Sequence, residues 1–318
     1  MKKKNKILII KTGYSETLDQ NISFKSSLGD VLRTTVILHL LKDNHVTWLV
    51  DKHAFKLLYR NPYIDKILIY DKTTALQLQT EKFDTVINFE KVPELCALAE
   101  SVKTRRRFGF TFNEEIAKSF AYDHSKEVHS ISQNIFKKKH HNKKWQEALY
   151  EMMGHSWNNE EYILGYKPKT KIKYDVGLNW AVGKTYPTKA WPRCNWEALA
   201  RKLVPQYSCS WQEGLECIYQ YIDWINSCNL LVTSDSLGLH IGIALKKKVI
   251  VLYGPTHPGE IDLYGLGERI LPPSNFDCMP CLSPECTNDK FCMDFISPSA
   301  VYEKVEFLLT PKIFANIA

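Results

Sequence analysis

The sequence predicts an α/β protein built from two doubly wound, mostly parallel sheets. Its 318 residues suit two domains of ordinary size. Hydrophobic residues make up 44% and charged residues 24%, which is close to a globular average and excludes a disordered, collagen-like or coiled-coil chain. Short apolar runs alternate with helical patterns, and this rhythm occurs once in each half. Such alternation is typical of βαβ units.

The first half begins with a continuous apolar run at Lys6–Ile10, typical of a parallel strand that is covered on both faces. From Asp30 to Leu41 the apolar residues recur at helical spacing, with an acidic residue at the start. Three β-rich runs follow, separated by stretches long enough for crossovers: His45–Val50, Ile67–Tyr70 and Thr85–Phe89. In such a sheet, ligands bind outside the carboxyl ends of the strands.

The second half repeats the rhythm after a domain boundary. A predicted helix at Lys144–Met153 ends at Gly154, and the polar stretch Gly165–Lys171 follows, so we expect domains at 1–166 and 167–318. The elements expected beyond it are strands at Tyr174–Leu178, Leu230–Thr233 and Val249–Tyr253, and helices at Asn195–Leu203, Ile218–Ile225 and Leu237–Leu245.

The net charge of +7 favours an anionic ligand, a nucleic acid or an anionic membrane surface without choosing among them. Much of it lies in three runs that we interpret as solvated faces: Met1–Lys4, Lys103–Arg107 and Lys137–Lys144. For Lys103–Arg107, contact with acceptor phosphates is the alternative.

A cytoplasmic protein is expected from two observations. The apolar run Ile7–Ile10 is too short for a signal peptide, and no run approaches the roughly 18 apolar residues of a membrane-spanning helix. The nine cysteines are an odd number, which indicates mostly reduced thiols.

Asp30 is the candidate proton acceptor of the first half. It follows Gly29, which permits a tight turn, and it stands at the start of a helix, where the helix dipole favours an ionised carboxylate. An aspartate held there can take a proton from an incoming hydroxyl. The alternative is an ordinary helix start.

Three loops of the second half follow predicted strands. In Asn179–Pro192, Lys184 and Lys189 stand beside Thr185 and Thr188, a set suited to phosphate oxygens, although a solvated loop is equally consistent.

The second of these loops, Ser234–His240, opens a helix whose free amides favour an anion, and Ser236 adds a hydroxyl. Alternatively, Asp235 or Ser236 is a simple N-cap and His240 a core histidine. In the third loop, Thr256 either binds a ligand or belongs to a turn at Gly254-Pro255.

Cys278, Cys281, Cys286 and Cys292 follow the pattern C-x2-C-x4-C-x5-C among turn-forming residues. Four thiolates at this spacing predict a closed structural site for zinc or iron, with no position left for substrate. The alternatives are reduced core cysteines or one disulfide.

In this order, five motifs resemble those of the heptosyltransferase-like glycosyltransferases of family nine. They are SLGDVLRTT at 27–35, TKAWP at 188–192, SDSLGLHIGIAL at 234–245, VLYGPTHP at 251–258 and the cysteine segment with its ISP sequence at 278–298. The resemblance implies a GT-B architecture, in which two Rossmann-like domains face each other across a cleft. The first holds mainly the acceptor and the second mainly the nucleotide sugar.

The resemblance also implies site residues. Asp30 matches the general base, and Lys189 matches the lysine at the diphosphate. The turn at Asp235–His240 would lie over the phosphates and the donor sugar. The donor-binding residues expected are Asn179, Lys184, Thr188, Lys189, Asp235, Ser236, Leu237, Gly238, His240 and Thr256.

The resulting hypothesis is inverting glycosyl transfer without a catalytic metal. The first donor expected is ADP-heptose, and the acceptor is a saccharide or a protein hydroxyl. No nucleic acid partner is expected, and peripheral contact with the inner membrane surface is a further expectation. The alternative is a non-catalytic GT-B scaffold that binds nucleic acid or an anionic surface.

The sequence departs from the family pattern at three places. An insertion at Thr12–Lys25 separates the first strand from the GD turn on the acceptor side. Leu237 stands where the family more often has glycine, which narrows the space over the diphosphate or the sugar. Val36 stands where proline is frequent.

Overall fold

The computed structural model describes residues 4–14, 25–213, 217–273 and 276–310. Most of the predicted insertion at 12–25 therefore lies outside the described residues. The chain divides into two compact units. Unit 1 is Met1–Lys167 with Gly259–Asp262, and unit 2 is Pro168–Pro258 with Leu263–Ala318. The short segment 259–262 comes from the second half of the sequence but belongs to unit 1, where the Trp145 amide donates to the Glu260 carbonyl at 2.7 Å.

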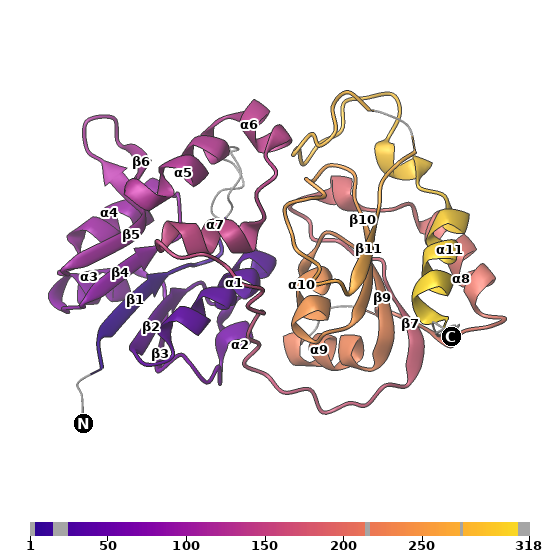
Figure 1. Ribbon diagram of the computed structural model, residues 1–318, viewed down its shortest axis with the longest axis horizontal. Coiled ribbons are helices and arrows are strands. Elements are labelled where there is room, and N and C mark those ends of the chain that lie inside the picture. The colour runs from indigo at the N-terminus through magenta and orange to yellow at the C-terminus, as the bar shows by residue number, and fades with distance from the viewer. Residues whose placement is uncertain (1–3, 15–24, 214–216, 274–275, 311–318) are drawn as a thin grey trace, which may run out of the picture. The chain divides into compact units, whose positions relative to one another are not determined.

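Unit 1 is built on a six-stranded sheet in the order β3-β2-β1-β4-β5-β6, with β6 antiparallel to β5 and the other neighbouring pairs parallel (Figure 1). Its strands are β1 (Lys6–Ile10), β2 (His45–Val50), β3 (Lys66–Ile69), β4 (Thr85–Asn88), β5 (Arg106–Asn113) and β6 (Lys118–Ala121). Its helices are α1 (Leu28–Thr34), α2 (Phe55–Leu58), α3 (Lys72–Thr80), α4 (Pro93–Ser101), α5 (Lys126–Gln133), α6 (Ile135–His140) and α7 (Trp145–Met152), with 3-10 turns η1 (Thr35–Leu41) and η2 (Asp123–Ser125).

The sheet of unit 1 is covered by helices on both faces. On one face, Leu8, Ile10 and Val86 pack against Leu78 of α3 and Leu95 of α4. On the other, α7 packs on α1 and η1, and the Tyr150 hydroxyl of α7 donates to the Val36 carbonyl at 3.2 Å. The continuous apolar runs are explained by this double burial.

The helix expected at Asp30–Leu41 is present but changes type in its middle. The α-helix α1 ends at Thr34, and the 3-10 turn η1 continues to Leu41. The hydroxyl of Thr34 donates to the Asp30 carbonyl and that of Thr35 to the Leu32 carbonyl, each at 2.6 Å. Threonine hydroxyls that bond to carbonyls of the preceding turn compete with the helical amides, which explains the change.

The prediction that the basic runs are solvated was wrong for three residues. Arg107 lies in β5 and is partly buried, because its guanidinium donates to the carbonyls of Ala99, Glu100 and Val102 at the end of α4. Lys143 pairs with Glu127 and Glu151, and Lys144 pairs with Asp262. These side chains fasten elements of unit 1 to one another.

Unit 2 is built on a five-stranded parallel sheet in the order β11-β10-β9-β7-β8. Its strands are β7 (Tyr174–Asn179), β8 (Cys209–Trp211), β9 (Cys228–Ser234), β10 (Lys248–Leu252) and β11 (Gly267–Ile270). Its helices are α8 (Arg193–Leu203), α9 (Ile218–Asn226), α10 (Leu237–Ala244) and α11 (Pro298–Leu309), with 3-10 turns η3 (Pro187–Lys189) and η4 (Cys292–Phe295).

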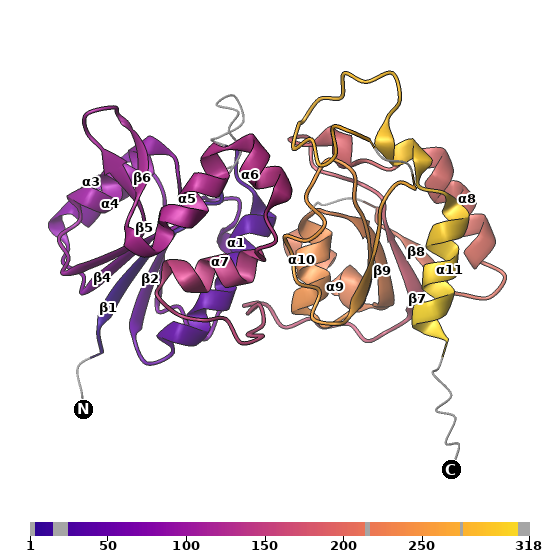
Figure 2. The ribbon, with the colours of Figure 1, turned by 45° about the horizontal axis from the view of Figure 1, so that its top comes forward.

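The helices of unit 2 also cover both faces of its sheet. Figure 2 shows α8 and α11 on one face and α9 and α10 on the other. The α8 and α11 face holds a core in which Trp196 and Val301 pack with the strand residues Val176, Val232 and Ile250. Cys292 and Met293 of η4 belong to the same core, so the cysteine segment is fastened to it at one end.

Two further expectations concern the environment of the chain. All nine cysteines lie within the described ranges, and none of them forms a disulfide bond. Within the described ranges, no helix combines the length and the apolar character needed to cross a bilayer.

A fully buried ion pair joins the carboxyl ends of β1 and β4. Lys11 and Glu90 are each 0% exposed, and Lys11 Nζ lies 3.6 Å from Glu90 Oε1. The same oxygen accepts hydrogen bonds from the Thr12 hydroxyl at 3.1 Å and the Gly13 amide at 2.8 Å. Buried charges are tolerated only with such partners, so the pair fixes how the chain leaves β1.

Lys11→Met is expected to lower the free energy of unfolding by about 3–5 kcal/mol, because it leaves the Glu90 carboxylate buried without the ammonium. The double variant Lys11→Met/Glu90→Gln should be more stable than Lys11→Met alone, since the amide removes the buried charge but still accepts from Thr12 and Gly13. Urea denaturation measures both. A double variant that is less stable than Lys11→Met would contradict this account.

Candidate functional site

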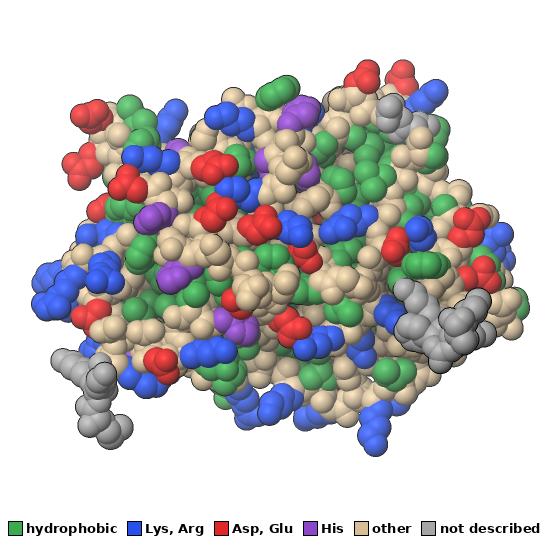
Figure 3. Space-filling model, in the orientation of Figure 1, with side chains coloured by type: hydrophobic (Ala, Val, Ile, Leu, Met, Phe, Trp, Pro, Cys, Tyr) green, Lys and Arg blue, Asp and Glu red, His purple; other side chains and the backbone are tan. Residues whose placement is uncertain are grey.

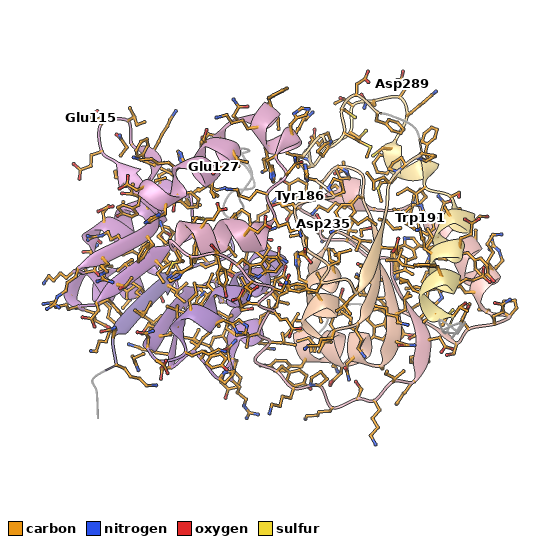
Figure 4. The ribbon with its side chains drawn as sticks, viewed as in Figure 1. Glu115, Glu127, Tyr186, Trp191, Asp235 and Asp289 are labelled. Atoms are coloured by element: carbon orange, nitrogen blue, oxygen red, sulfur yellow. The ribbon has the colours of Figure 1, made fainter. Side chains whose placement is uncertain are left out.

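The carboxyl ends of β7, β9 and β10 are adjacent in the sheet of unit 2, and Lys189 and Asp235 meet there. Lys189 Nζ donates to the Asp235 carbonyl at 2.8 Å and lies 3.3 Å from its carboxylate. The ring of Tyr186 lies 5.3 Å from the same ammonium, and Figure 4 shows Tyr186 and Asp235 close together in unit 2. The 3-10 turn η3 therefore brings Lys189 to the start of α10.

Two buried hydroxyl oxygens lie at the same edge of the sheet. Ser234 is the last residue of β9, and Thr256 follows β10 by four residues. Neither Ser234 Oγ nor Thr256 Oγ1 has a hydrogen-bond partner within the part of the chain that the structure describes. A buried hydroxyl without a partner is costly, so both oxygens are suited to a polar ligand.

Asn179 is 0% exposed, and its side chain connects the polar groups at this edge of the sheet. Its Nδ2 donates to Thr233 Oγ1 at 2.7 Å and lies 3.5 Å from Ser236 Oγ. Its Oδ1 accepts from the Tyr221 hydroxyl at 2.8 Å. The predicted donor-binding residue Asn179 thus positions the turn between β9 and α10.

No side chain of the N-cap residue occupies the free amides at the amino end of α10, so these amides are available to a ligand. Ser236 occupies the N-cap position, but its hydroxyl makes no capping bond to the helix amides. Leu237 and Gly238 supply the first amides, where the helix dipole favours negative charge. His240 is 5% exposed and lies within the body of the helix.

Two predicted donor-binding residues lie apart from this group. Lys184 is exposed in the loop after β7. Thr188 is buried, and its hydroxyl donates to the Ser283 carbonyl at 2.7 Å, so it fastens this loop to the cysteine segment.

In unit 1, Asp30 lies in the first turn of α1 within a cluster of three charges. Arg33 Nη2 lies 2.8 Å from Asp30 Oδ1, and Arg33 Nη1 lies 3.4 Å from Glu260 Oε1. The Arg33 guanidinium also lies over the Trp145 ring, 4.3 Å from its centroid. The Asp30 carboxylate is 15% exposed and is held next to the Arg33 cation.

The sequence analysis missed Arg33, Glu260 and Ser234. Asp30 and Arg33 are three residues apart, which is the spacing of an ion pair along a helix, so the sequence contained a signal for this contact. Glu260 gave no such signal, because it is 227 residues from Arg33.

The four cysteines of 278–292 lie near one another. Burial, followed by the nearby Cys281, Cys278 and Cys286, raises the pKa of the Cys292 thiol to about 11. Asn288 Nδ2 donates to Cys278 Sγ at 3.2 Å. Across the described ranges, however, no three His, Cys, Asp or Glu residues form a group arranged to hold a metal ion.

The family comparison matches part of unit 2. Residues 217–292 fit the family model for glycosyltransferase family 9 (heptosyltransferase). The predicted resemblance to family 9 is confirmed. This match includes β9, α10, β10 and the cysteine segment.

Among curated relatives, lipooligosaccharide heptosyltransferase 2 of Campylobacter jejuni subsp. jejuni serotype O:6 is 31% identical over 85 residues. The alignment covers 26% of this chain and 27% of that protein. Lipopolysaccharide heptosyltransferase 1 of Pseudomonas aeruginosa is 30% identical over 33% of this chain and 36% of its own length. The chain thus matches about a third or less of the length of these two relatives.

Among solved structures, E. coli heptosyltransferase WaaC with ADP-2-deoxy-2-fluoro heptose has a TM-score of 0.63 at 17% identity. The likeness covers 95% of this chain and 99% of WaaC. The iron-containing dodecameric glycosyltransferase TibC from enterotoxigenic E. coli has a TM-score of 0.58 at 13% identity, covering 97% of this chain and 77% of TibC. These likenesses concern the fold, and the predicted GT-B class with two Rossmann-like units is confirmed.

Gly238→Ala is expected to disturb the turn before α10. A Cβ there would lie 2.2 Å from Asn179 Nδ2 and 2.5 Å from the Tyr221 hydroxyl. Overpacking of this kind costs about 1–3 kcal/mol, so the melting temperature should fall. The matched control is Gly183→Ala, whose Cβ would meet nothing within 4 Å. Equal melting temperatures for the two variants would contradict this prediction, because they would show that the turn accommodates a Cβ atom at position 238.

Proposed function

We propose that this protein is an inverting glycosyltransferase that moves a sugar from a nucleoside diphosphate donor to a hydroxyl of a saccharide or a protein. The observation that carries the proposal is the group at the carboxyl edge of unit 2. Lys189 and the amino end of α10 lie at that edge, where Ser234 ends β9 and Thr256 follows β10, each with a buried hydroxyl oxygen. Cation, amides and hydroxyls together are suited to a diphosphate.

On the donor side, we assign the diphosphate to the amino end of α10. The amides of Leu237 and Gly238 and the Lys189 ammonium would stabilise the charge that develops on the leaving diphosphate. Asp235 would hold Lys189 in place through its carbonyl and carboxylate. Ser234 and Thr256 would donate their hydroxyls to the phosphate or sugar oxygens.

On the acceptor side, we assign the general base to Asp30 of unit 1. The acceptor oxygen would attack the anomeric carbon as its proton passes to the Asp30 carboxylate. The bond between that carbon and the diphosphate oxygen would break, and the electron pair would leave with the nucleoside diphosphate. One bond forms on the face of the carbon opposite the bond that breaks, so the configuration is inverted.

ADP-heptose is the first donor to test. The solved structures of similar fold include WaaC with ADP and TibC with ADP-D-beta-D-heptose. We further propose a cytoplasmic location, where the free thiols of this chain would remain reduced.

Two variants separate binding from chemistry. A ligand specific to the folded protein raises its stability with occupancy, so ADP should raise the melting temperature more than GDP, UDP or CMP.

Asp30→Asn should keep this shift in melting temperature and lower turnover with ADP-heptose about a hundred- to ten-thousandfold. Lys189→Ala should weaken ADP binding about tenfold to a hundredfold, the loss expected for a hydrogen bond to a charged group.

The control for Lys189→Ala is Lys202→Ala, which removes an exposed lysine of α8. Full transfer by Asp30→Asn would show that another group is the base. If none of these nucleotides or their sugars stabilised the protein, the donor site would be wrong and the non-catalytic scaffold would be favoured.

We also propose a structural metal, zinc or iron, at the four cysteines. The donor set fits such an ion by its chemistry, because four cysteines, the ligands of closed structural sites, stand within residues 278–292. TibC, which has a similar fold, is described as iron-containing, and this supports testing iron beside zinc. Cys278, Cys281, Cys286 and Cys292 would hold the ion and leave no position for substrate.

Cys286→Ser should lower the metal content, measured by elemental analysis, from about one ion per chain towards none. Cys194→Ser is the control, because Cys194 is an exposed cysteine outside the segment. In metal-free protein, Cys292 should react with iodoacetamide more slowly than the exposed Cys194 at neutral pH, because Cys292 is buried and a thiol with a pKa of about 11 has a smaller thiolate fraction there than an ordinary thiol. Unchanged metal content in Cys286→Ser would contradict the assignment.

A further inference from the structure

The cysteine segment, residues 278–292, is bonded to the loop that carries Lys189. The Thr188 hydroxyl donates to the Ser283 carbonyl at 2.7 Å. Thr188 is 7% exposed, so this bond is shielded from water and is stronger than an exposed one. Thr188 and Lys189 are neighbours in the 3-10 turn η3. The bond to the segment therefore fixes the turn one residue before the ammonium.

The same segment is bonded to the loop that carries Thr256. The Leu282 amide donates to the Pro255 carbonyl at 2.7 Å, and Thr256 follows Pro255 directly. The packing is close at the preceding residue as well, because a Cβ on Gly254 would lie 2.9 Å from Cys292 Sγ. The segment thus contacts the loop after β10 at two points.

The backbone of Leu282 is held in a strained conformation. Its φ is 56°, in the left-handed region that residues with a side chain rarely adopt. Such a conformation persists only where the surrounding contacts determine it. The Leu282 amide is bonded to Pro255, and the carbonyl of the next residue, Ser283, is bonded to Thr188. The strained residue therefore lies where the segment connects the two loops.

These contacts come from the packed part of the segment. Residues 278–284 are partly buried, whereas 285–290 are exposed. Figure 3 shows charged side chains at the outer tip of the segment and hydrophobic ones, a class that includes cysteine and proline, between that tip and the body of unit 2. Asp289 lies at the tip, as Figure 4 shows. The exposed tip takes no part in the bonds to the two loops.

The segment is itself held in place at its carboxyl end. Cys292 belongs to the core of unit 2. Just beyond the segment, the Ile296 carbonyl accepts a hydrogen bond from the Trp191 indole at 3.0 Å, and Trp191 is 2% exposed. A segment can position a loop only if it is itself fixed, and this condition is met here.

We propose that Leu282 and Ser283 position the two loops around the donor diphosphate, and that Thr188 is a positioning residue and not a ligand of the donor. This inference rests on the proposed nucleotide-sugar transfer. Without the bond between Thr188 and Ser283, Lys189 would no longer be held in register with the amides of α10, and the diphosphate would be bound less tightly. A nucleoside lacks the diphosphate, so its affinity should not change.

The test measures, by isothermal titration calorimetry, the affinity for the nucleoside diphosphate that the wild type binds, expected to be ADP, and for the matching nucleoside. Thr188→Val removes the hydroxyl at nearly constant volume. It should weaken diphosphate binding about two- to tenfold, the range that one hydrogen bond contributes, and leave nucleoside binding unchanged.

The matched control is Thr170→Val, because the Thr170 hydroxyl also donates to a carbonyl of unit 2, that of Asp223 at 2.6 Å. Thr170→Val should lower the melting temperature about as much as Thr188→Val but keep the wild-type affinity for the diphosphate. This comparison separates positioning of the donor loops from a general loss of stability.

A second pair of variants tests the contact from the side of the segment. Leu282→Pro removes the amide hydrogen and disfavours a φ of 56°, so it should weaken diphosphate binding at least as much as Thr188→Val. Leu282→Gly keeps the amide and adopts this φ without strain, so it should restore the wild-type affinity.

The positioning role is overturned if Thr188→Val binds the diphosphate like wild type, if Thr170→Val loses as much affinity, or if nucleoside binding weakens equally. It is also overturned if a folded Leu282→Pro variant keeps full affinity. If Leu282→Pro does not fold, Thr188→Val and Thr170→Val decide alone. Failure of the wild type to bind any nucleoside diphosphate would be a different result, since it would overturn the proposed function and this inference with it.

Discussion

Both units are constrained by the burial of their parallel strands on two faces. In β1, β9 and β10 almost every residue is buried, so these strands have no exposed face on which to place polar groups. Functional side chains must then come from the loops that follow the strands, where the carboxyl ends meet. The proposed site residues lie in the connections after strands: Asp30 in the first turn of α1, Lys189 in the 3-10 turn η3, and Asp235 and Thr256 in the loops after β9 and β10. The position of the chemistry is a consequence of the sheet.

The two units stabilise these strand ends by different means. Unit 1 uses the charged pair of Lys11 and Glu90, both fully buried. Unit 2 uses the neutral amide of Asn179, which joins Thr233 to Tyr221 through its two polar atoms. A neutral group carries a smaller desolvation penalty than an ion pair. It also adds no fixed charge at the amino end of α10, so the electrostatics there depend on Lys189, Asp235 and the helix itself.

Apolar periodicity was enough to predict both sheets, since strands such as Lys6–Ile10 and helices such as Asn195–Leu203 carry it without interruption. It missed β5, β6, β8 and β11. The strand β5 begins with Arg106 and Arg107, and the Arg107 side chain finds its partners at the end of α4 and not in solvent. Among the predicted donor-binding residues, Lys189 and Asp235 are in contact. Thr188 and Glu260 depend on contacts with distant segments, which no local pattern records.

The contact between Lys189 and Asp235 also explains why the net charge of +7 says little about the donor site. The Asp235 carboxylate offsets part of the Lys189 charge, so binding at this edge would depend on directed donors: the Lys189 ammonium, the amides of α10 and the hydroxyls of Ser234 and Thr256. Directed donors discriminate by geometry, whereas an excess of lysines attracts anions of many shapes. Recognition of the donor would therefore depend on how these groups are placed at the edge of unit 2 and not on the net charge of the chain.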